Sequence, residues 1–157
     1  MIHLRLPGTL RYRDLAVRVV AAACKLVGKD GDLQKPERAF DDEVVSAFSE
    51  AWNNIAIHSY HDQPLGEVQI EIEPDHDQIW IRIQDFGASF EPARVPAPDL
   101  EALPESGLGL YIMRSFMDDV TYQPGRPNVL TLTKRLPDRV RSAGRAAGVS
   151  RRGDRKK

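Results

Sequence analysis

Two polar residues one helical turn apart, Glu50 and Asn54, give the first indication of a functional site. They lie four positions apart in the segment 49–60, and residues at i and i+4 share one face of a helix. A carboxylate beside a carboxamide, with apolar Ile55 and Ile57 next to them, indicates a helix face that lines a polar pocket. Taken alone, the pair could also belong to a solvated helix face.

Two glycine-containing segments favour the pocket. Asp85 and Gly87 stand where an alternating apolar strand pattern ends, and Gly87 would permit a close backbone approach or a positive φ. Gly107 and Gly109 precede a helical pattern, and the amides and dipole of a helix N-terminus attract phosphate. Because the third glycine of a dinucleotide fingerprint and the Gly-Lys-Ser/Thr of a P-loop are both absent, phosphate binding here would rely on glycine amides and a metal.

The helices that must hold these residues follow from apolar periodicity. The spacing predicts a helix over 14–27 that ends at Gly28, and a second one from Pro36 to about Tyr60. A third helix is expected to begin at Leu108. The apolar stripe of the first helix is Leu15, Val19, Ala22, Ala23 and Leu26; that of the second is Phe40, Val44, Ala47, Phe48, Ala51, Ile55 and His58.

Alternating residues predict the strands. They cover 2–6, 68–72 and 79–83, and a closing hairpin pairs 120–122 with 130–132. The proline-rich segment 91–105 is expected to be a loop. The order of helix, helix, two strands, loop, helix and two strands predicts an α+β fold, a two-layer sandwich with helices on one face of a mixed β-sheet.

Length and composition fit one soluble globular domain. The 157 residues are 41% hydrophobic and 29% charged, which excludes fibrous and fully disordered classes. No apolar run reaches the roughly 18 residues of a membrane helix, and the first residues lack a secretory pattern, so a cytoplasmic protein is expected. The single Cys24 allows no internal disulfide and is expected to be a buried structural thiol.

The C-terminal segment differs from the rest. Residues 138–157 contain eight Arg and Lys and two Asp with few large apolar side chains, a composition typical of a disordered appendage. The folded domain is therefore expected to span 1–137. Direct nucleic-acid binding by the basic tail is not expected.

Three motifs in this order resemble the GHKL ATP-binding superfamily, and specifically the small anti-sigma-factor serine kinases of bacteria. They are Glu50-x-x-x-Asn54-x-x-x-His58, Asp85-x-Gly87-x-x-Phe90 and Gly107-Leu108-Gly109-Leu110. The resemblance covers about residues 1–136. It implies the Bergerat (GHKL) ATP-binding fold with ATP and Mg²⁺ as cofactors.

The resemblance also implies roles for single residues. Asp85 would accept a hydrogen bond from the adenine amino group, Asn54 would help to hold a Mg²⁺ that bridges the phosphates, and Glu50 would act as the catalytic general base towards an acceptor hydroxyl. The other implied nucleotide-binding residues are His58, Gly87, Phe90, Gly107, Leu108, Gly109, Leu110 and Thr131, with Thr133 as the alternative to Thr131.

The leading functional hypothesis from this resemblance is an ATP-dependent protein serine kinase that is also an anti-sigma factor. It would phosphorylate an anti-anti-sigma protein of the STAS type, bind a sigma factor and form a homodimer. Two alternatives stay open: a non-catalytic module in which ATP orders 91–105 and gates partner binding, and a switch kinase that acts on a regulatory scaffold. A histidine kinase is not expected, because no phosphoacceptor helix precedes the ATP-binding motifs.

Overall fold

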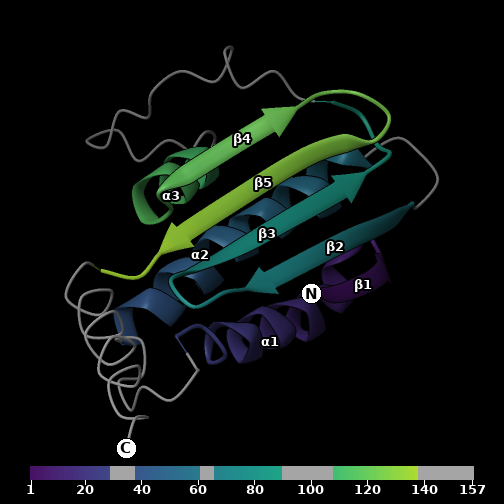
Figure 1. Ribbon diagram of the computed structural model, residues 1–157. Helices are drawn as coiled ribbons and strands as arrows, with labels where there is room; N and C mark the ends of the chain where they lie inside the picture. The colour runs from purple at the N-terminus through teal and green to yellow at the C-terminus, as the bar shows by residue number, and fades with distance from the viewer. Residues whose placement is uncertain (29–37, 61–65, 90–107, 138–157) are drawn as a thin grey trace, which may run out of the picture.

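The computed structural model describes residues 1–28, 38–60, 66–89 and 108–137, which form a five-stranded sheet with α-helices on one face (Figure 1). The elements are β1 (Ile2–Pro7), the 3₁₀ turn η1 (Leu10–Tyr12), α1 (Arg13–Cys24), α2 (Arg38–Asn54), the π-helix η2 (Ile55–Ser59), β2 (Glu67–Pro74), β3 (Gln78–Asp85), α3 (Leu108–Phe116), β4 (Asp119–Gln123) and β5 (Asn128–Arg135). The predicted α+β class, with helices on one face, is confirmed.

The sheet has the order β1-β2-β3-β5-β4, and every pairing in it is antiparallel. The predicted mixed sheet is therefore wrong in this respect. The reason is the final hairpin: β4 lies at the edge, and β5 returns between β4 and β3, antiparallel to both. The register sets Ile83 opposite both Ile70 and Leu130, so apolar residues of neighbouring strands share the face that the helices cover.

Helix α1 packs through small residues. Its buried side chains are Ala16, Val20, Ala23 and Cys24, whereas Leu15 and Leu26 are 49% and 50% exposed. The predicted stripe was one position out of phase, because the smaller residues let the helix lie close to its neighbours and the larger leucines stay outside. The prediction for Cys24 is confirmed, since the thiol is fully buried and burial raises the pKa of Cys24 to about 12.

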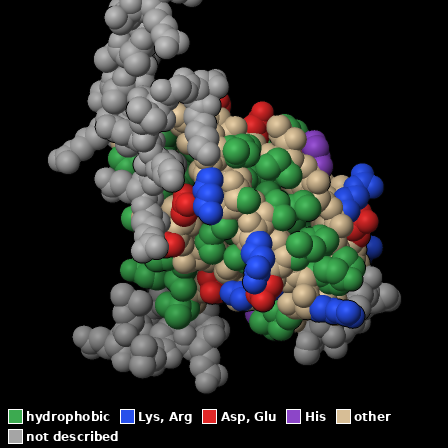
Figure 2. Space-filling view, turned by 90° about the horizontal axis from the view of Figure 1, so that it is seen from below, with side chains coloured by type: hydrophobic (Ala, Val, Ile, Leu, Met, Phe, Trp, Pro, Cys, Tyr) green, Lys and Arg blue, Asp and Glu red, His purple; other side chains and the backbone are tan. Residues whose placement is uncertain are grey.

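An exposed apolar surface results from this packing. Leu10 of η1, together with Leu15 and Leu26, leaves about half of each side chain in solvent. Figure 2 shows hydrophobic side chains gathered on this side of the molecule, with basic ones between them. We call these three leucines the α1 apolar surface.

Helix α2 is the central element of the core. The predicted residues from Phe40 to Ile55 are buried, and so is Trp52, which the predicted stripe omitted. The Trp52 Nε1 donates to the carbonyl oxygen of Thr9 at 3.0 Å, which ties α2 to the segment after β1. His58, placed on the stripe by prediction, is exposed, because the i→i+5 bonding of η2 adds a residue to the turn and changes the helical phase.

Several predictions fall outside the described residues. These are the start of the second helix at residues 36 and 37, the loop 91–105 and the basic tail 138–157. None of the helices in the described ranges has both the length and the apolar character that crossing a bilayer requires.

Candidate nucleotide-binding site

The N-terminus of α3 lies against the Glu50 and Asn54 pair of α2. A Cβ atom built on Gly109 would lie 3.0 Å from Glu50 Oε2 and 3.6 Å from Asn54 Oδ1. The predicted helical pair and the predicted glycine segment therefore meet in space. Both side chains are half-buried, and neither forms a hydrogen bond or ion pair with another residue of the described part, so their oxygens remain available to a ligand.

The first turn of α3 supplies the donors that phosphate needs. The amides of Leu108, Gly109 and Leu110 open this nine-residue helix, and the first N–H groups of a helix have no partner within it. With the helix dipole they favour an anion. Leu110 packs partly against the core and fixes the turn, and the missing side chain of Gly109 keeps the path to Glu50 open.

The donor set at this place fits Mg²⁺. Glu50 Oε2 and Asn54 Oδ1 approach one common point, the Cβ position of Gly109, to within 3.0 and 3.6 Å. Magnesium takes oxygen ligands, keeps most of its waters and needs few protein groups. Asn54, with Glu50 beside it, is therefore chemically sufficient to hold a hydrated ion next to phosphates at α3.

Asp85 forms the other end of the site, where β3 ends. It is 5% exposed. Its Oδ1 accepts from the Gly87 amide at 2.9 Å and from Asn128 Nδ2 at 3.1 Å. Burial raises the pKa of Asp85, while the polar groups of Asn128, Gly87 and Ser59 beside the carboxylate act in the opposite direction.

Gly87 is required by a close backbone contact. A Cβ atom at this residue would collide with the backbone oxygen and the Cβ of Ser59, the last residue of η2. The Ala88 amide donates to the same Ser59 oxygen at 2.8 Å. The chain after Asp85 is thus held directly against the end of the helix that carries Asn54, which joins the two ends of the site.

Tyr60 connects this junction to the start of β2. Its hydroxyl accepts from the Phe86 amide at 3.1 Å and donates to the Glu67 carbonyl at 3.4 Å. Burial raises the pKa of Tyr60, which keeps the phenol neutral and able to donate. Its ring leaves no room for a Cβ at Gly8 or Gly66. Tyr60 is therefore a packing residue.

Comparison with known proteins identifies this arrangement. Residues 6–134 match the family model described as "Histidine kinase-like ATPase domain". The chain belongs to this family. The match runs from the last residues of β1 into β5 and includes Glu50, Asn54, Asp85 and Gly109.

Relatives within the histidine kinase-like ATPase family include bacterial regulators. The chain is 34% identical over 144 residues to a protein named serine-protein kinase RsbW from Bacillus cereus (strain Q1), which covers 85% of this chain and 83% of the relative. It is 35% identical over 103 residues to a protein named anti-sigma F factor from Oceanobacillus iheyensis, covering 60% of this chain and 68% of the relative.

A solved structure has the same fold. The histidine kinase domain of the blue-light activated histidine kinase EL346 from Erythrobacter litoralis superposes with a TM-score of 0.55 at 16% identity, covering 87% of this chain and 64% of that chain. At this identity the likeness concerns the fold alone, and it agrees with the histidine kinase-like ATPase assignment.

Asn128 is the site residue of this ATPase domain that sequence reasoning missed. It lies opposite Asp85 in the β3–β5 register and is 1% exposed. Thr131, which the resemblance placed near the adenine, lies opposite Arg82 instead. Since side chains alternate along a strand, Thr131 points with Arg82 to the sheet face away from the helices, and Thr133 lies two residues further on the same side. The structure therefore does not bring Thr131 to the side of the sheet on which Asp85 and Asn128 meet.

Four predicted site residues remain, and the structure describes two of them. His58 is exposed on η2, four residues beyond Asn54, and Leu108 is 42% exposed at the start of α3. Phe90 and Gly107 lie outside the described residues. The signal that could have located Asn128 is the hairpin: with the turn at residues 124–127, β5 begins at Asn128, two residues earlier than the apolar alternation alone suggested.

Proposed function

We propose that this chain is an ATP- and Mg²⁺-dependent protein serine kinase and anti-sigma factor. The observation that carries the proposal is the convergence of Glu50 Oε2 and Asn54 Oδ1 on Gly109 at the start of α3. Relatives named serine-protein kinase RsbW and anti-sigma F factor support a protein serine as the phosphate acceptor and a sigma factor as the binding partner. The acceptor is a serine of a STAS-type anti-anti-sigma protein.

The proposed mechanism assigns one task to each end of the site. Asp85 accepts a hydrogen bond from the adenine amino group, and the α3 amides hold the phosphates. Bound Mg²⁺, held by Asn54, would neutralise phosphate charge and orient the γ-phosphoryl group. Glu50 takes the proton from the acceptor serine hydroxyl or orients it for in-line attack, as is usual in phosphoryl transfer, where catalysis is mainly positioning and charge stabilisation.

Binding and transfer can be separated by two variants. Asn54→Ala should weaken Mg²⁺-dependent ATP binding, measured by calorimetry, by about tenfold or more, equivalent to about 1.4 kcal/mol. Glu50→Gln keeps the side-chain volume and should retain ATP binding, but transfer of the γ-phosphate to the STAS protein should fall by roughly 10²–10⁴-fold.

Asp42→Asn is the matched control. It removes one negative charge from the same helix eight residues before Glu50, at an exposed position, and should change neither quantity. Wild-type transfer by Glu50→Gln would contradict the role of Glu50 as general base, whereas a wild type that binds ATP but transfers no phosphate would be a non-catalytic ATP-binding module. A wild type that does not bind ATP would contradict the proposed kinase activity altogether. A switch kinase differs from the proposal only in its partner, so a pull-down of a sigma factor decides between them.

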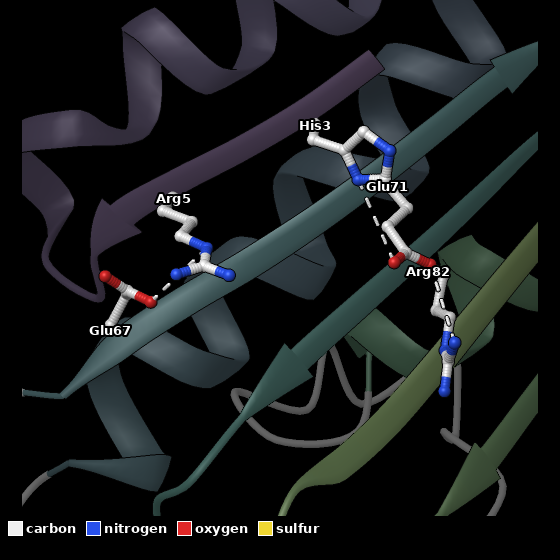
Figure 3. Close-up of polar contacts among 5 residues, drawn as sticks. All are labelled: His3, Arg5, Glu67, Glu71 and Arg82. Carbon is white, nitrogen blue, oxygen red and sulfur yellow. Dashed lines mark hydrogen bonds and ion pairs between the residues drawn. The ribbon is translucent and has the colours of Figure 1, made fainter. Parts of the chain in front are cut away.

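The sigma factor is expected to dock on the α1 apolar surface. Its leucines are about half exposed. The open face of the sheet instead carries polar side chains that already have partners: His3 and Arg82 both lie beside Glu71, and Arg5 pairs with Glu67 (Figure 3). Leu15→Ser should therefore weaken sigma-factor binding without changing ATP binding, and Arg5→Gln on the open face should change neither.

Two further parts of the proposal concern the setting of the chain. We place it in the cytoplasm, where a sigma factor and an anti-anti-sigma protein are found, and we propose that it acts as a homodimer. Sedimentation equilibrium of the wild type tests the dimer directly. The ATP-binding domain would span residues 1–137, and removal of residues 138–157 should leave ATP binding unchanged.

A further inference from the structure

Asn128 has a hydrogen-bond partner for every polar position of its side chain. Its Nδ2 donates to Asp85 Oδ1 at 3.1 Å and to the Gly87 carbonyl at 3.2 Å. Its Oδ1 accepts from Ser89 Oγ at 2.5 Å and from the Gly125 amide at 3.1 Å. A carboxamide has two N–H donors and two lone pairs, so these contacts use all of them and fix which side of the amide faces Asp85.

The partners of Asn128 come from three separate segments. Asp85 ends β3, Gly87 and Ser89 belong to the chain that follows it, and Gly125 lies in the turn between β4 and β5. Because Asn128 is 1% exposed, bulk solvent does not compete with these contacts. Its position therefore decides how the Asp85 carboxylate is oriented relative to both neighbouring segments.

The acceptor positions of the Asp85 carboxylate show which of its oxygens is free to bind a ligand. An ionised carboxylate has about four acceptor positions. Among the described residues, the Gly87 amide and Asn128 Nδ2 both donate to Oδ1 and occupy its two positions. Oδ2 therefore remains for a ligand, and its direction is fixed because Oδ1 is held by both donors.

We propose that Asn128 is a positioning residue for Asp85, which holds the carboxylate with Oδ2 free to accept a hydrogen bond and so makes the site selective for 6-amino over 6-oxo purine nucleotides. The inference rests on the proposed ATP binding and adds to it the residue that sets base selectivity. An amino group donates to a carboxylate, whereas a 6-oxo group presents a second acceptor and is repelled. An Asp85 that could turn would lose this discrimination.

The test compares ATP with inosine triphosphate, which carries oxygen in place of the 6-amino group. The ratio of their Kd values, measured by calorimetry with Mg²⁺, cancels the phosphate contribution and any general weakening of the site. In the wild type the ratio should favour ATP by about tenfold or more. Asn128→Asp, which turns two donors into acceptors facing Asp85, and Asn128→Ala, which removes all four hydrogen bonds, should both bring it close to one.

Gln84→Glu is the matched control for added charge. Gln84 precedes Asp85 on β3 but, by strand alternation, lies on the opposite face of the sheet with Arg82, so the ratio should stay at the wild-type value. Thermal unfolding without nucleotide shows which variants are folded. Where neither Asn128 variant folds, the Asn128 side-chain NH₂ resonances of the wild type decide: they should shift with ATP much more than with inosine triphosphate.

The outcomes separate the two proposals. A wild type that binds neither nucleotide contradicts the proposed function. A wild type that prefers ATP, with Asn128 variants that keep the same preference or with NH₂ resonances that respond equally to both nucleotides, contradicts the role of Asn128 while the proposed ATP binding stands.

Discussion

Gly109 of α3 and Glu50 of α2 are packed so closely that a methyl group on the first would lie 3.0 Å from Oε2 of the second. The contact is with the far end of a flexible side chain, so the fold could accommodate the methyl by moving the carboxylate. The lack of a side chain at Gly109 therefore lets the carboxylate of Glu50 keep its position next to α3. It is not needed for α3 to fold.

Gly109→Ala should separate activity from stability. Alanine is favoured over glycine in a helix by about 1 kcal/mol, so Tm should stay the same or rise. Phosphate transfer should fall about tenfold or more, because Glu50 must move out of position. Ser115→Ala, at an exposed position of the same helix, is the control and should leave transfer unchanged. An active Gly109→Ala would show that the position of Glu50 does not matter for transfer.

Gly87→Ala should instead destabilise the fold. Here the added methyl meets the backbone of Ser59, which cannot move aside without breaking the 2.8 Å hydrogen bond from the Ala88 amide. Overpacking of this kind typically costs about 1–3 kcal/mol. Urea unfolding should show a lower midpoint with an unchanged m value, and ATP binding should weaken. Ala88→Ser, at the exposed neighbouring residue, should leave the midpoint in place.

The sequence predicted those parts of the site that depend on local spacing. Glu50 and Asn54 face α3 because residues four positions apart lie about one helical turn apart, and α3 begins at Leu108, where the apolar pattern placed its start. The i+4 rule holds only while the helix is regular. At His58 it failed, since the π-helix η2 changes the phase, and local composition does not show where such a turn begins.

Contacts between strands distant in sequence could not be predicted in the same way. Asn128 and Asp85 meet because β5 inserts between β3 and β4, which is a property of the whole sheet. Side chains alternate along a strand, so the face on which Thr131 lies depends on the pairing of β5 with β3, which the resemblance to a family did not show. The one-position error on α1 has a related cause: the choice between Leu15 and Ala16 depends on how closely the helix approaches its neighbours.

Asp85→Asn should make the protein more stable, although it removes the hydrogen bond between the carboxylate and the adenine amino group. Burial raises the pKa of Asp85 above its ordinary value, so between these two values the folded state binds more protons than the unfolded one. Stability attributable to this group therefore falls as pH rises through that window and stays lowered above it. The asparagine variant lacks this penalty, and its oxygen can still accept from Gly87 and Asn128.

The difference in Tm between Asp85→Asn and the wild type should therefore be positive at pH 7 and shrink as pH is lowered towards the ordinary pKa of an aspartate, about 4. ATP binding at pH 7 should weaken by at least about 1.4 kcal/mol. Asp42→Asn, at an exposed site, serves as the reference for removing a carboxylate. A Tm difference that grows on acidification would mean that folding lowers the pKa of Asp85 instead of raising it.

Lys134 joins three elements, and its replacement tests how α3 is fixed. Its Nζ donates to the carbonyl oxygen of Phe116, the last residue of α3, at 2.5 Å and forms an ion pair with Glu43 of α2, while its side chain is 15% exposed. Lys134→Met keeps the aliphatic stem but leaves the α3 carbonyl and the Glu43 carboxylate without this partner. Since Glu43 is 36% exposed and water screens part of the pair, we expect a loss of about 1–2 kcal/mol.

A double-mutant cycle with Glu43→Gln divides this loss between its two causes. If the ion pair contributes, the losses in free energy of unfolding of the two single variants should sum to more than that of the double variant, and the excess should shrink as salt is added. The part due to the Phe116 carbonyl should persist in salt. Since Lys134 fixes the C-terminal end of α3 and Gly109 lies at the other end, ATP affinity of folded Lys134→Met should change much less than its stability. A large loss of ATP affinity in a fully folded Lys134→Met variant would mean that the hydrogen bond from Lys134 to the Phe116 carbonyl also sets the position of the phosphate-binding turn.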